Sequence, residues 1–139
     1  MDQQTIEAKM AAQLDGAKGS AMTTVFAWEY ETLGLVTYVA MRPRKHPERR
    51  YLLRVSFDDF PRRAPSYVFV DPTTRELKDD AWPVGVKHSD PLSGICTPGT
   101  REFHEKYHLG DAQYPWSEER YSFLDTLQRI HALVEHGSP

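Results

Sequence analysis

Cys96 is the residue with the clearest potential for chemistry, because it is the only thiol among the 139 residues. It lies in the segment 87–99, KHSDPLSGICTPG, among prolines, glycines and small polar residues rather than in an apolar run. A buried cysteine packs as a small hydrophobe, whereas a thiol on an open loop becomes a nucleophile when a nearby base or cation favours the thiolate. This setting favours a nucleophile, and a packed, inert thiol is the alternative.

Three histidines flank this thiol. His88 precedes Cys96 by eight residues, while His104 and His108 follow it by eight and twelve residues. If residues 101–108 form a helix, the i, i+4 spacing puts the rings of His104 and His108 on one face. A flap carrying these rings over Cys96 would supply a general base. The alternative is a pair of solvated surface histidines.

A zinc site is a second way to use these side chains, because thiolate and imidazole are the usual zinc ligands. His88, Cys96, His104 and His108 together would provide four of them. Structural zinc sites usually contain paired cysteines, and Glu105 does not complete the His-Glu-x-x-His pattern of metalloproteases. The leading interpretation therefore uses no metal and no cofactor.

The elements that must position these residues begin with a helix and a run of strands. Ile6, Met10 and Leu14 recur at helical spacing, which predicts a helix over Thr5–Leu14. Segments rich in β-branched and aromatic residues predict strands over Thr23–Tyr30, Leu33–Met41, Tyr51–Phe57 and Ser66–Val70. The short connections between these segments indicate a four-stranded antiparallel meander.

An irregular segment and a last helix complete the chain. Regular periodicity is lost between Thr73 and Tyr114, and the aromatic residues in this stretch argue against disorder. We therefore expect a folded active-site flap around Cys96. The last helix is expected to be capped by Ser117, to end at Gly137 and to pack on the sheet. The predicted class is α+β, as one domain over residues 1–139.

A histidine of the last helix and a cluster of basic residues both have structural explanations. His131 lies on the apolar stripe of the last helix, so we expect it to be packed in the core. The segment Arg42–Arg50 contains five cationic residues, and we expect it to be a solvated turn. The alternative is that it docks an acidic surface of a partner protein. Arg62 and Arg63 either extend that basic patch or are solvated turn residues.

Composition excludes several classes of protein. A net charge of −3 gives no general field for holding nucleic acid. No stretch approaches the roughly 20 apolar residues needed to cross a bilayer, and the polar N-terminus contains no hydrophobic signal core. A single cysteine forms no internal disulfide, which suits a reducing compartment. We expect a cytoplasmic protein with no nucleic-acid or membrane partner.

Four motifs follow one another in a set order between Tyr51 and Val134. They are the strand 51–57 with Phe60-Pro61 and Ala64-Pro65 after it, the strand 66–70, the triplet Gly94-Ile95-Cys96, and Trp116-Ser117 with the helix that follows. This order resembles the ubiquitin-conjugating enzymes, the UBC-like superfamily, and more closely its bacterial branch. The triplet is similar to the family's Gly-x-Ile-Cys active-site segment with the spacer residue missing.

The resemblance implies a transferase that carries a ubiquitin-like protein as a thioester on Cys96. Its partners would be an activating (adenylating) enzyme, which supplies the acyl group, and the ubiquitin-like modifier itself. The chain departs from the family pattern because His88 stands where the family has the asparagine of a His-Pro-Asn motif. His88 would then donate a hydrogen bond to the oxyanion or act as a base. A catalytically inactive binding or scaffold module of the same fold is the competing expectation.

Overall fold

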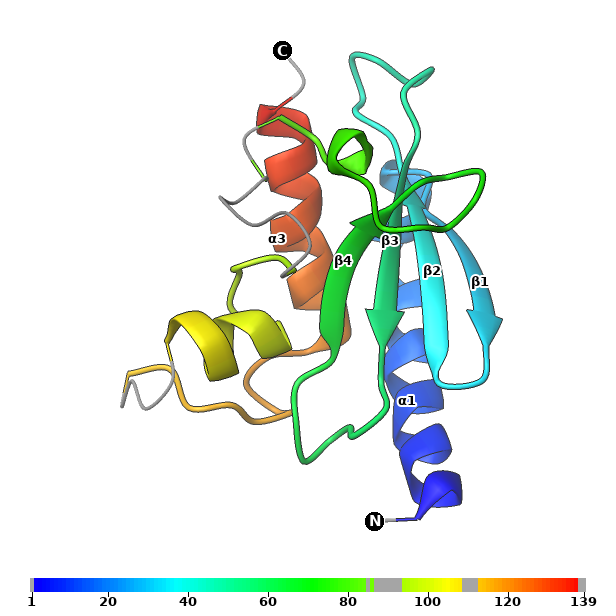
Figure 1. The fold of residues 1–139 in the computed structure, drawn as a ribbon. Helices are drawn as coiled ribbons and strands as arrows, with labels where there is room; N and C mark the ends of the chain where they lie inside the picture. The colour runs from blue at the N-terminus through cyan, green and yellow to red at the C-terminus, as the bar shows by residue number, and fades with distance from the viewer. Residues whose placement is uncertain (1, 85, 87–93, 109–112, 138–139) are drawn as a thin grey trace.

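A four-stranded antiparallel sheet forms the centre of the computed structural model, which describes residues 2–84, 86, 94–108 and 113–137 (Figure 1). The strands lie side by side in chain order, β1 (Glu29–Leu33), β2 (Val36–Met41), β3 (Tyr51–Ser56) and β4 (Ser66–Val70). Val39 of β2 faces Leu53 of β3, and Leu53 in turn faces Phe69 of β4. All three side chains are fully buried, so this row is the core face of the sheet. The predicted α+β class and the meander are confirmed.

Two helices cover the core face of this sheet. In α1 (Gln3–Lys18) the predicted stripe of Ile6, Met10 and Leu14 is buried, and α3 (Phe123–His136) packs against α1. Phe123 at the start of α3 also stacks on Tyr67 of β4, with ring centroids 6.4 Å apart. The core therefore lies between the sheet and the two helices. None of the helices in the described ranges is long and apolar enough to cross a membrane.

Both long helices differ from their predicted bounds. The first begins earlier because the Asp2 side chain accepts the Thr5 N–H at 2.8 Å, and it continues through Gly16 to Lys18. The last begins later than predicted, because Ser117 caps only an isolated turn while the hydroxyl of Ser122 accepts the Asp125 N–H of α3. Gly137 follows the last residue of α3, as predicted.

The predicted strand over Thr23–Tyr30 is wrong as far as Trp28, because only Glu29 and Tyr30 belong to a strand. Ser20 caps a short helix, α2 (Ala21–Val25), through the Met22 N–H, and β1 begins only at Glu29. The hydroxyl of Thr23 donates to the Ala17 carbonyl at the end of α1. Ala27 then takes a positive φ of 54°, which ends the helical path and turns the chain into β1. Local capping outweighs the β-propensity of this segment.

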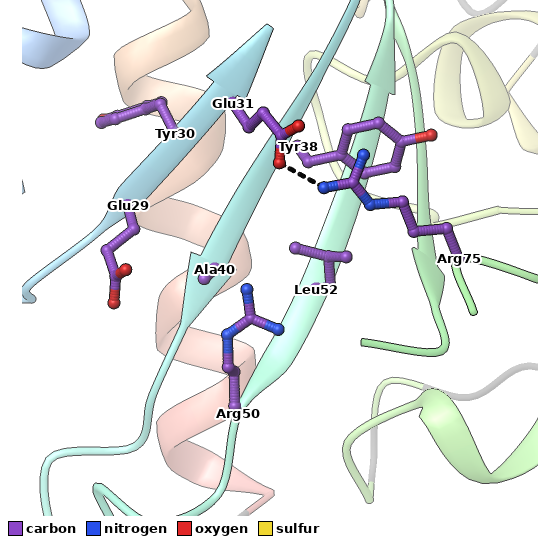
Figure 2. A pocket seen from close by; sticks show the side chains of 8 residues that line it. All are labelled: Glu29, Tyr30, Glu31, Tyr38, Ala40, Arg50, Leu52 and Arg75. Atoms are coloured by element: carbon purple, nitrogen blue, oxygen red, sulfur yellow. Dashed lines mark hydrogen bonds and ion pairs between the residues drawn. The ribbon is translucent and has the colours of Figure 1, made fainter. Parts of the chain in front are cut away.

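The face of the sheet away from the helices is covered in part by the turn that follows β4 (Figure 2). In this turn Arg75, at a φ of 63°, lies over the Tyr38 ring at 4.1 Å and pairs with Glu31. Beside it is a shallow hollow of about 120 Å³ whose floor includes Ala40 and Leu52. This cover explains why Leu52 is buried although it alternates with the core-facing residues of β3.

The segment predicted as an irregular flap contains two short helical pieces within its described residues. The first is the 3₁₀ turn η1 (Asp79–Ala81), and the second is the π-helical turn η3 (Phe103–Tyr107), which Arg101 and Glu102 lead into. In η3 the His108 N–H donates to the Phe103 carbonyl five residues earlier, at 2.8 Å. The part of the flap that contains Cys96 is therefore ordered structure joined to the edge of the sheet.

Candidate functional site

Cys96 lies in a sharp turn beside the edge of β4. Gly94 has a φ of 96°, and a Cβ added there would lie 2.3 Å from Cγ of Glu102. Only glycine fits both that dihedral angle and that space. The next residue, Ile95, is buried and donates its N–H to the Tyr67 carbonyl at 3.1 Å. Cys96 follows directly and is partly exposed, so the chain presents its one thiol from a fixed backbone.

The residues after Cys96 form a closely hydrogen-bonded loop. The Thr97 N–H donates to the Ile95 carbonyl, the Thr100 N–H to the Thr97 carbonyl, and the Gly99 N–H to the His104 ring. The Thr100 hydroxyl accepts the Phe103 N–H, which caps the helical turn that follows. These backbone donors are already satisfied. An oxyanion formed at Cys96 would therefore need its hydrogen bonds from other groups.

The electrostatic setting of Cys96 favours the neutral thiol. Partial burial raises the pKa of Cys96 above its ordinary value, and desolvation is the only cause of that shift. A thiol activated for attack has a cation or an imidazolium nearby that lowers its pKa. In the part of the chain that the structure describes, no charged side chain lowers the pKa of Cys96. A nucleophilic Cys96 would therefore need another group to accept its proton.

His104 is buried and both of its ring nitrogens have partners. Nε2 accepts the Gly99 N–H at 3.1 Å, which leaves the proton on Nδ1, where it donates to the Tyr114 carbonyl at 2.9 Å. Burial is the main reason why the pKa of His104 lies below its usual value. The ring packs against Tyr121, with centroids 4.7 Å apart. In this arrangement His104 is a neutral ring that joins the Cys96 loop to Tyr114, and it has no open lone pair for a base.

His108 lies at the end of η3 and is partly exposed. Its ring stacks on Phe103 with centroids 4.2 Å apart, and it lies 5.8 Å from the Tyr114 ring. The predicted pairing of His104 and His108 on one helical face takes a different form, because the turn is π-helical and only His104 is buried. A proton-accepting role for His108 stays a prediction.

His88 falls outside the described residues, so its role also stays a prediction. Among the described residues no three His, Cys, Asp or Glu side chains gather closely enough to hold a metal ion. Cys96, His104 and His108 therefore do not form a three-ligand cluster in this part of the chain. The zinc alternative would need a rearrangement that releases His104 from Gly99 and Tyr114.

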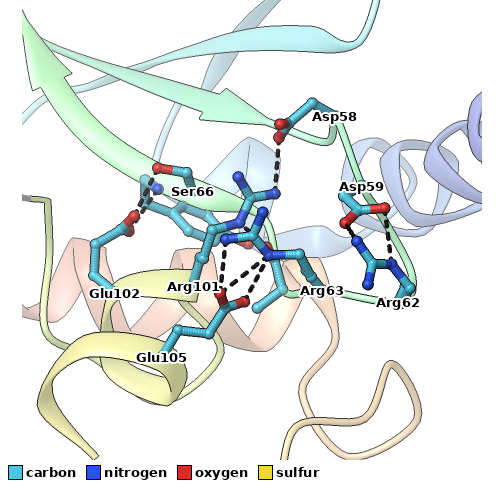
Figure 3. Close-up of polar contacts among 10 residues, drawn as sticks. Asp58, Asp59, Arg62, Arg63, Ser66, Arg101, Glu102 and Glu105 are labelled. Atoms are coloured by element: carbon cyan, nitrogen blue, oxygen red, sulfur yellow. Dashed lines mark hydrogen bonds and ion pairs between the residues drawn. The ribbon is translucent and has the colours of Figure 1, made fainter. Parts of the chain in front are cut away.

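Ion pairs bind this segment to the loop between β3 and β4 (Figure 3). Arg101 donates to Asp58 at 2.7 Å and to the Ala64 carbonyl at 3.0 Å, and Arg63 forms a two-oxygen pair with Glu105 at 2.7–3.0 Å. Arg63 is thus part of the ion pairs that join the two segments and does not extend a basic patch. Arg62 pairs with Asp59. The partners in the Arg101–Asp58 and Arg63–Glu105 pairs lie about 40 residues apart, so the sequence pattern could not predict these ion pairs.

Glu102 adds a buried carboxylate to this bracing. It accepts the Ser66 hydroxyl at 2.7 Å and the Tyr67 N–H at 3.0 Å. Burial raises the pKa of Glu102, and its two hydrogen bonds oppose that shift. The carboxylate lies against Gly94, two residues before Cys96. This acid, which sequence reasoning missed, is therefore a second link between β4 and the Cys96 turn, beside the Ile95–Tyr67 backbone bond.

No family model matches this chain, and no curated protein matches it. Its function must be argued from its own residues.

Proposed function

We propose that this protein is a ubiquitin-conjugating-like transferase that carries a ubiquitin-like protein as a thioester on Cys96. One observation carries the proposal: the only thiol of the chain is partly exposed on a rigid turn, beside the last strand of a four-stranded meander. The motif order from Tyr51 to Val134, described above as resembling the ubiquitin-conjugating enzymes, supports the same proposal. Thiol chemistry and ATP-dependent activation suit the reducing cytoplasm.

The proposed reaction is two successive acyl transfers. The Cys96 sulfur attacks the thioester carbonyl on the activating enzyme, a new S–C bond forms, and the enzyme's own thiolate leaves. An amine of the target then attacks the Cys96 thioester, which forms an amide and releases the thiol. The neutral Cys96 thiol must lose its proton in the first transfer, and the attacking amine must lose one in the second. Each transfer therefore needs a proton acceptor and a hydrogen-bond donor to the oxyanion. His88 and His108 stay the candidates from this chain, while His104 braces the loop.

The test is a charging assay with the cognate activating enzyme, the modifier and ATP. We expect an adduct that dithiothreitol removes, and no adduct with Cys96→Ala. Cys96→Ser should give an oxyester that resists dithiothreitol, which identifies the attacking atom. His108→Ala keeps Cys96 intact and tests whether this ring assists. Absence of an adduct with the correct pair would refute the transferase.

A binding module with an idle cysteine is the second candidate, and the raised pKa of Cys96 favours it. The charging assay separates the two, because Cys96 is partly exposed in this fold in either case. A scaffold would bind the modifier or the activating enzyme without forming the thioester adduct. Iodoacetamide should alkylate Cys96 in the folded protein, faster as the pH rises, and a thiol that reacts only after unfolding would exclude the transferase.

A further inference from the structure

A hollow of about 260 Å³ opens at the end of the molecule where α2 meets the connection between β2 and β3. Val25 and Phe26 form one wall, and Pro43 and Pro47 belong to the other. Val25 is 49% exposed, which leaves an apolar side chain in solvent at the mouth of the hollow. A hollow of this volume has room for an apolar side chain of a partner.

The rim of this hollow is strongly basic. The segment 42–50 holds five cationic side chains and one carboxylate, in a chain whose net charge is −3. Arg42 and Arg44 line the hollow, and Arg44 and Lys45 are exposed. Within the described residues, neither Arg44 nor Lys45 forms an ion pair between its side chain and a carboxylate. The positive charge at this rim is thus available to an acidic partner.

Both walls are held by hydrogen bonds that run from the surface at Arg44 to the buried Trp28 indole. The Arg44 N–H donates to the Glu135 carboxylate of α3 at 2.8 Å, and the same oxygen lies 3.0 Å from Nε2 of His131. Nδ1 of His131 accepts the Trp28 indole N–H at 2.9 Å, and the Phe26 ring lies on His131 at 4.1 Å. The groove is therefore preformed, and binding of a partner would not cost conformational entropy to order its walls.

The structure favours a peptide over a nucleic acid as the occupant. One face of the Phe26 ring lies against His131, and the Arg44 guanidinium lies 6.0 Å from the ring, so no open aromatic face remains for a base. The net charge of −3 also gives the protein no general field for holding nucleic acid.

We propose that this groove docks an acidic peptide segment of a partner protein. One apolar side chain of the segment enters between Val25 and Pro47, and the flanking carboxylates pair with Arg44 and Lys45. This docking surface goes beyond the proposed transferase activity and does not depend on Cys96.

The experiment is fluorescence anisotropy with short labelled peptides in which Asp and Glu flank one Leu or Phe. We expect Arg44→Glu to weaken binding by about tenfold and Val25→Ser by about fivefold, with weaker binding at higher salt. Lys106→Glu, an exposed cation on η3, is the matched control and should leave the affinity unchanged. Far-UV circular dichroism verifies that each variant is folded.

Three results would overturn the docking site. The first is an affinity that Arg44→Glu leaves unchanged in a folded protein. The second is equal binding of peptides whose apolar residue is replaced by Ser, which would mean simple attraction of charge. The third is a labelled single-stranded oligonucleotide that binds while the peptides do not. The Cys96→Ala protein should bind the peptides normally, so this outcome is separate from that of the charging assay.

Discussion

Gly94 fixes the entry to the Cys96 turn through two constraints at one residue. Its φ of 96° lies in the region that side chains disfavour, and the side chain of Glu102 occupies the place of a Cβ. Glu102 cannot give way freely, because Ser66 and Tyr67 hold its carboxylate. Glycine at this position is therefore a condition for presenting the thiol at the edge of β4.

We expect Gly94→Ala to lower the free energy of unfolding by about 2–4 kcal/mol, through backbone strain and overpacking against Glu102. Urea unfolding followed by fluorescence measures this change. Gly16→Ala is the matched control, because Gly16 lies inside α1 with nothing within 4 Å of an added Cβ. That change should stabilise the protein by about 0.5–1 kcal/mol. Equal effects at the two glycines would contradict the account of Gly94.

At the scale of elements, the segment 94–108 is held to the sheet mainly by polar contacts. Arg101 contributes three of them: its backbone N–H donates to Pro65, and its side chain reaches Ala64 and Asp58. The Arg101 side chain is only 14% exposed whereas that of Asp58 is 60% exposed, so the bond to Ala64 is the better shielded of the two side-chain bonds. The Arg101–Asp58 pair also lowers the pKa of Asp58.

We expect Arg101→Ala to cost about 2 kcal/mol of stability and to speed hydrogen exchange at the Ile95 amide, which faces Tyr67. Arg62→Ala is the matched control. The Arg62 side chain is 72% exposed and pairs only with nearby Asp59, so its loss should change little. Exchange by NMR or mass spectrometry measures both variants. An unchanged Ile95 exchange rate in Arg101→Ala would show that other contacts hold the segment.

Across the molecule, one chain of hydrogen bonds joins three distant parts of the sequence, and it runs from the buried Trp28–His131 bond to the exposed Arg44–Glu135 bond. Trp28 before β1, His131 and Glu135 of α3, and Arg44 between β2 and β3 follow one another in this chain. His131 is neutral here, because Nδ1 must accept from Trp28. Burial lowers the pKa of His131, with Glu135 opposing and Arg44 adding to the shift.

This lowered pKa makes stability depend on pH. In the unfolded chain His131 takes up a proton near its ordinary pKa of about 6.5, whereas the folded protein resists protonation until lower pH. The free energy of unfolding should therefore fall as the pH drops from about 7 to about 5. His104 acts in the same direction, while the raised pKa of Glu102 opposes it at the acid end.

We expect His131→Gln to be less stable than the wild type at pH about 7 but to lose less stability on acidification, because an amide does not titrate in this range. Urea unfolding at several pH values measures the two slopes. If the free energy of unfolding changes with pH equally in His131→Gln and in the wild type, His131 does not cause the pH dependence.

Repeated, local patterns of residues are enough to specify several elements of this fold. The alternation in Tyr51–Ser56 and the dense β-branched run Ser66–Val70 each specify a strand, and Ile6, Met10 and Leu14 specify one face of α1. His131 was predicted to be packed because its position on the apolar stripe of α3 decides its burial. In these cases residues close together in the chain are sufficient to predict the secondary structure or the burial.

The start of α3 depends on tertiary contacts that the local pattern does not contain. The sequence predicts Ser117 as the cap, whereas in the structure Ser122 caps α3 and the Gln13 side chain of α1 accepts the Phe123 N–H at 2.9 Å. Trp116, before Ser117, is held instead by its bond to the Pro61 carbonyl. Local helix propensity does not fix where this helix begins, and contacts with residues more than 50 positions away in the chain do.

The site shows the same division. Sequence reasoning placed Cys96 on an ordered, irregular segment, because its neighbours are turn-forming residues and its aromatic surroundings argue against disorder. It could not tell that His104 is used up between Gly99 and Tyr114, or that Glu102 and Arg101 fasten the turn to β4 and the loop before it. Residue types set what chemistry is available, but hydrogen-bond partners decide which groups are free to perform it, and those partners are assembled only by folding.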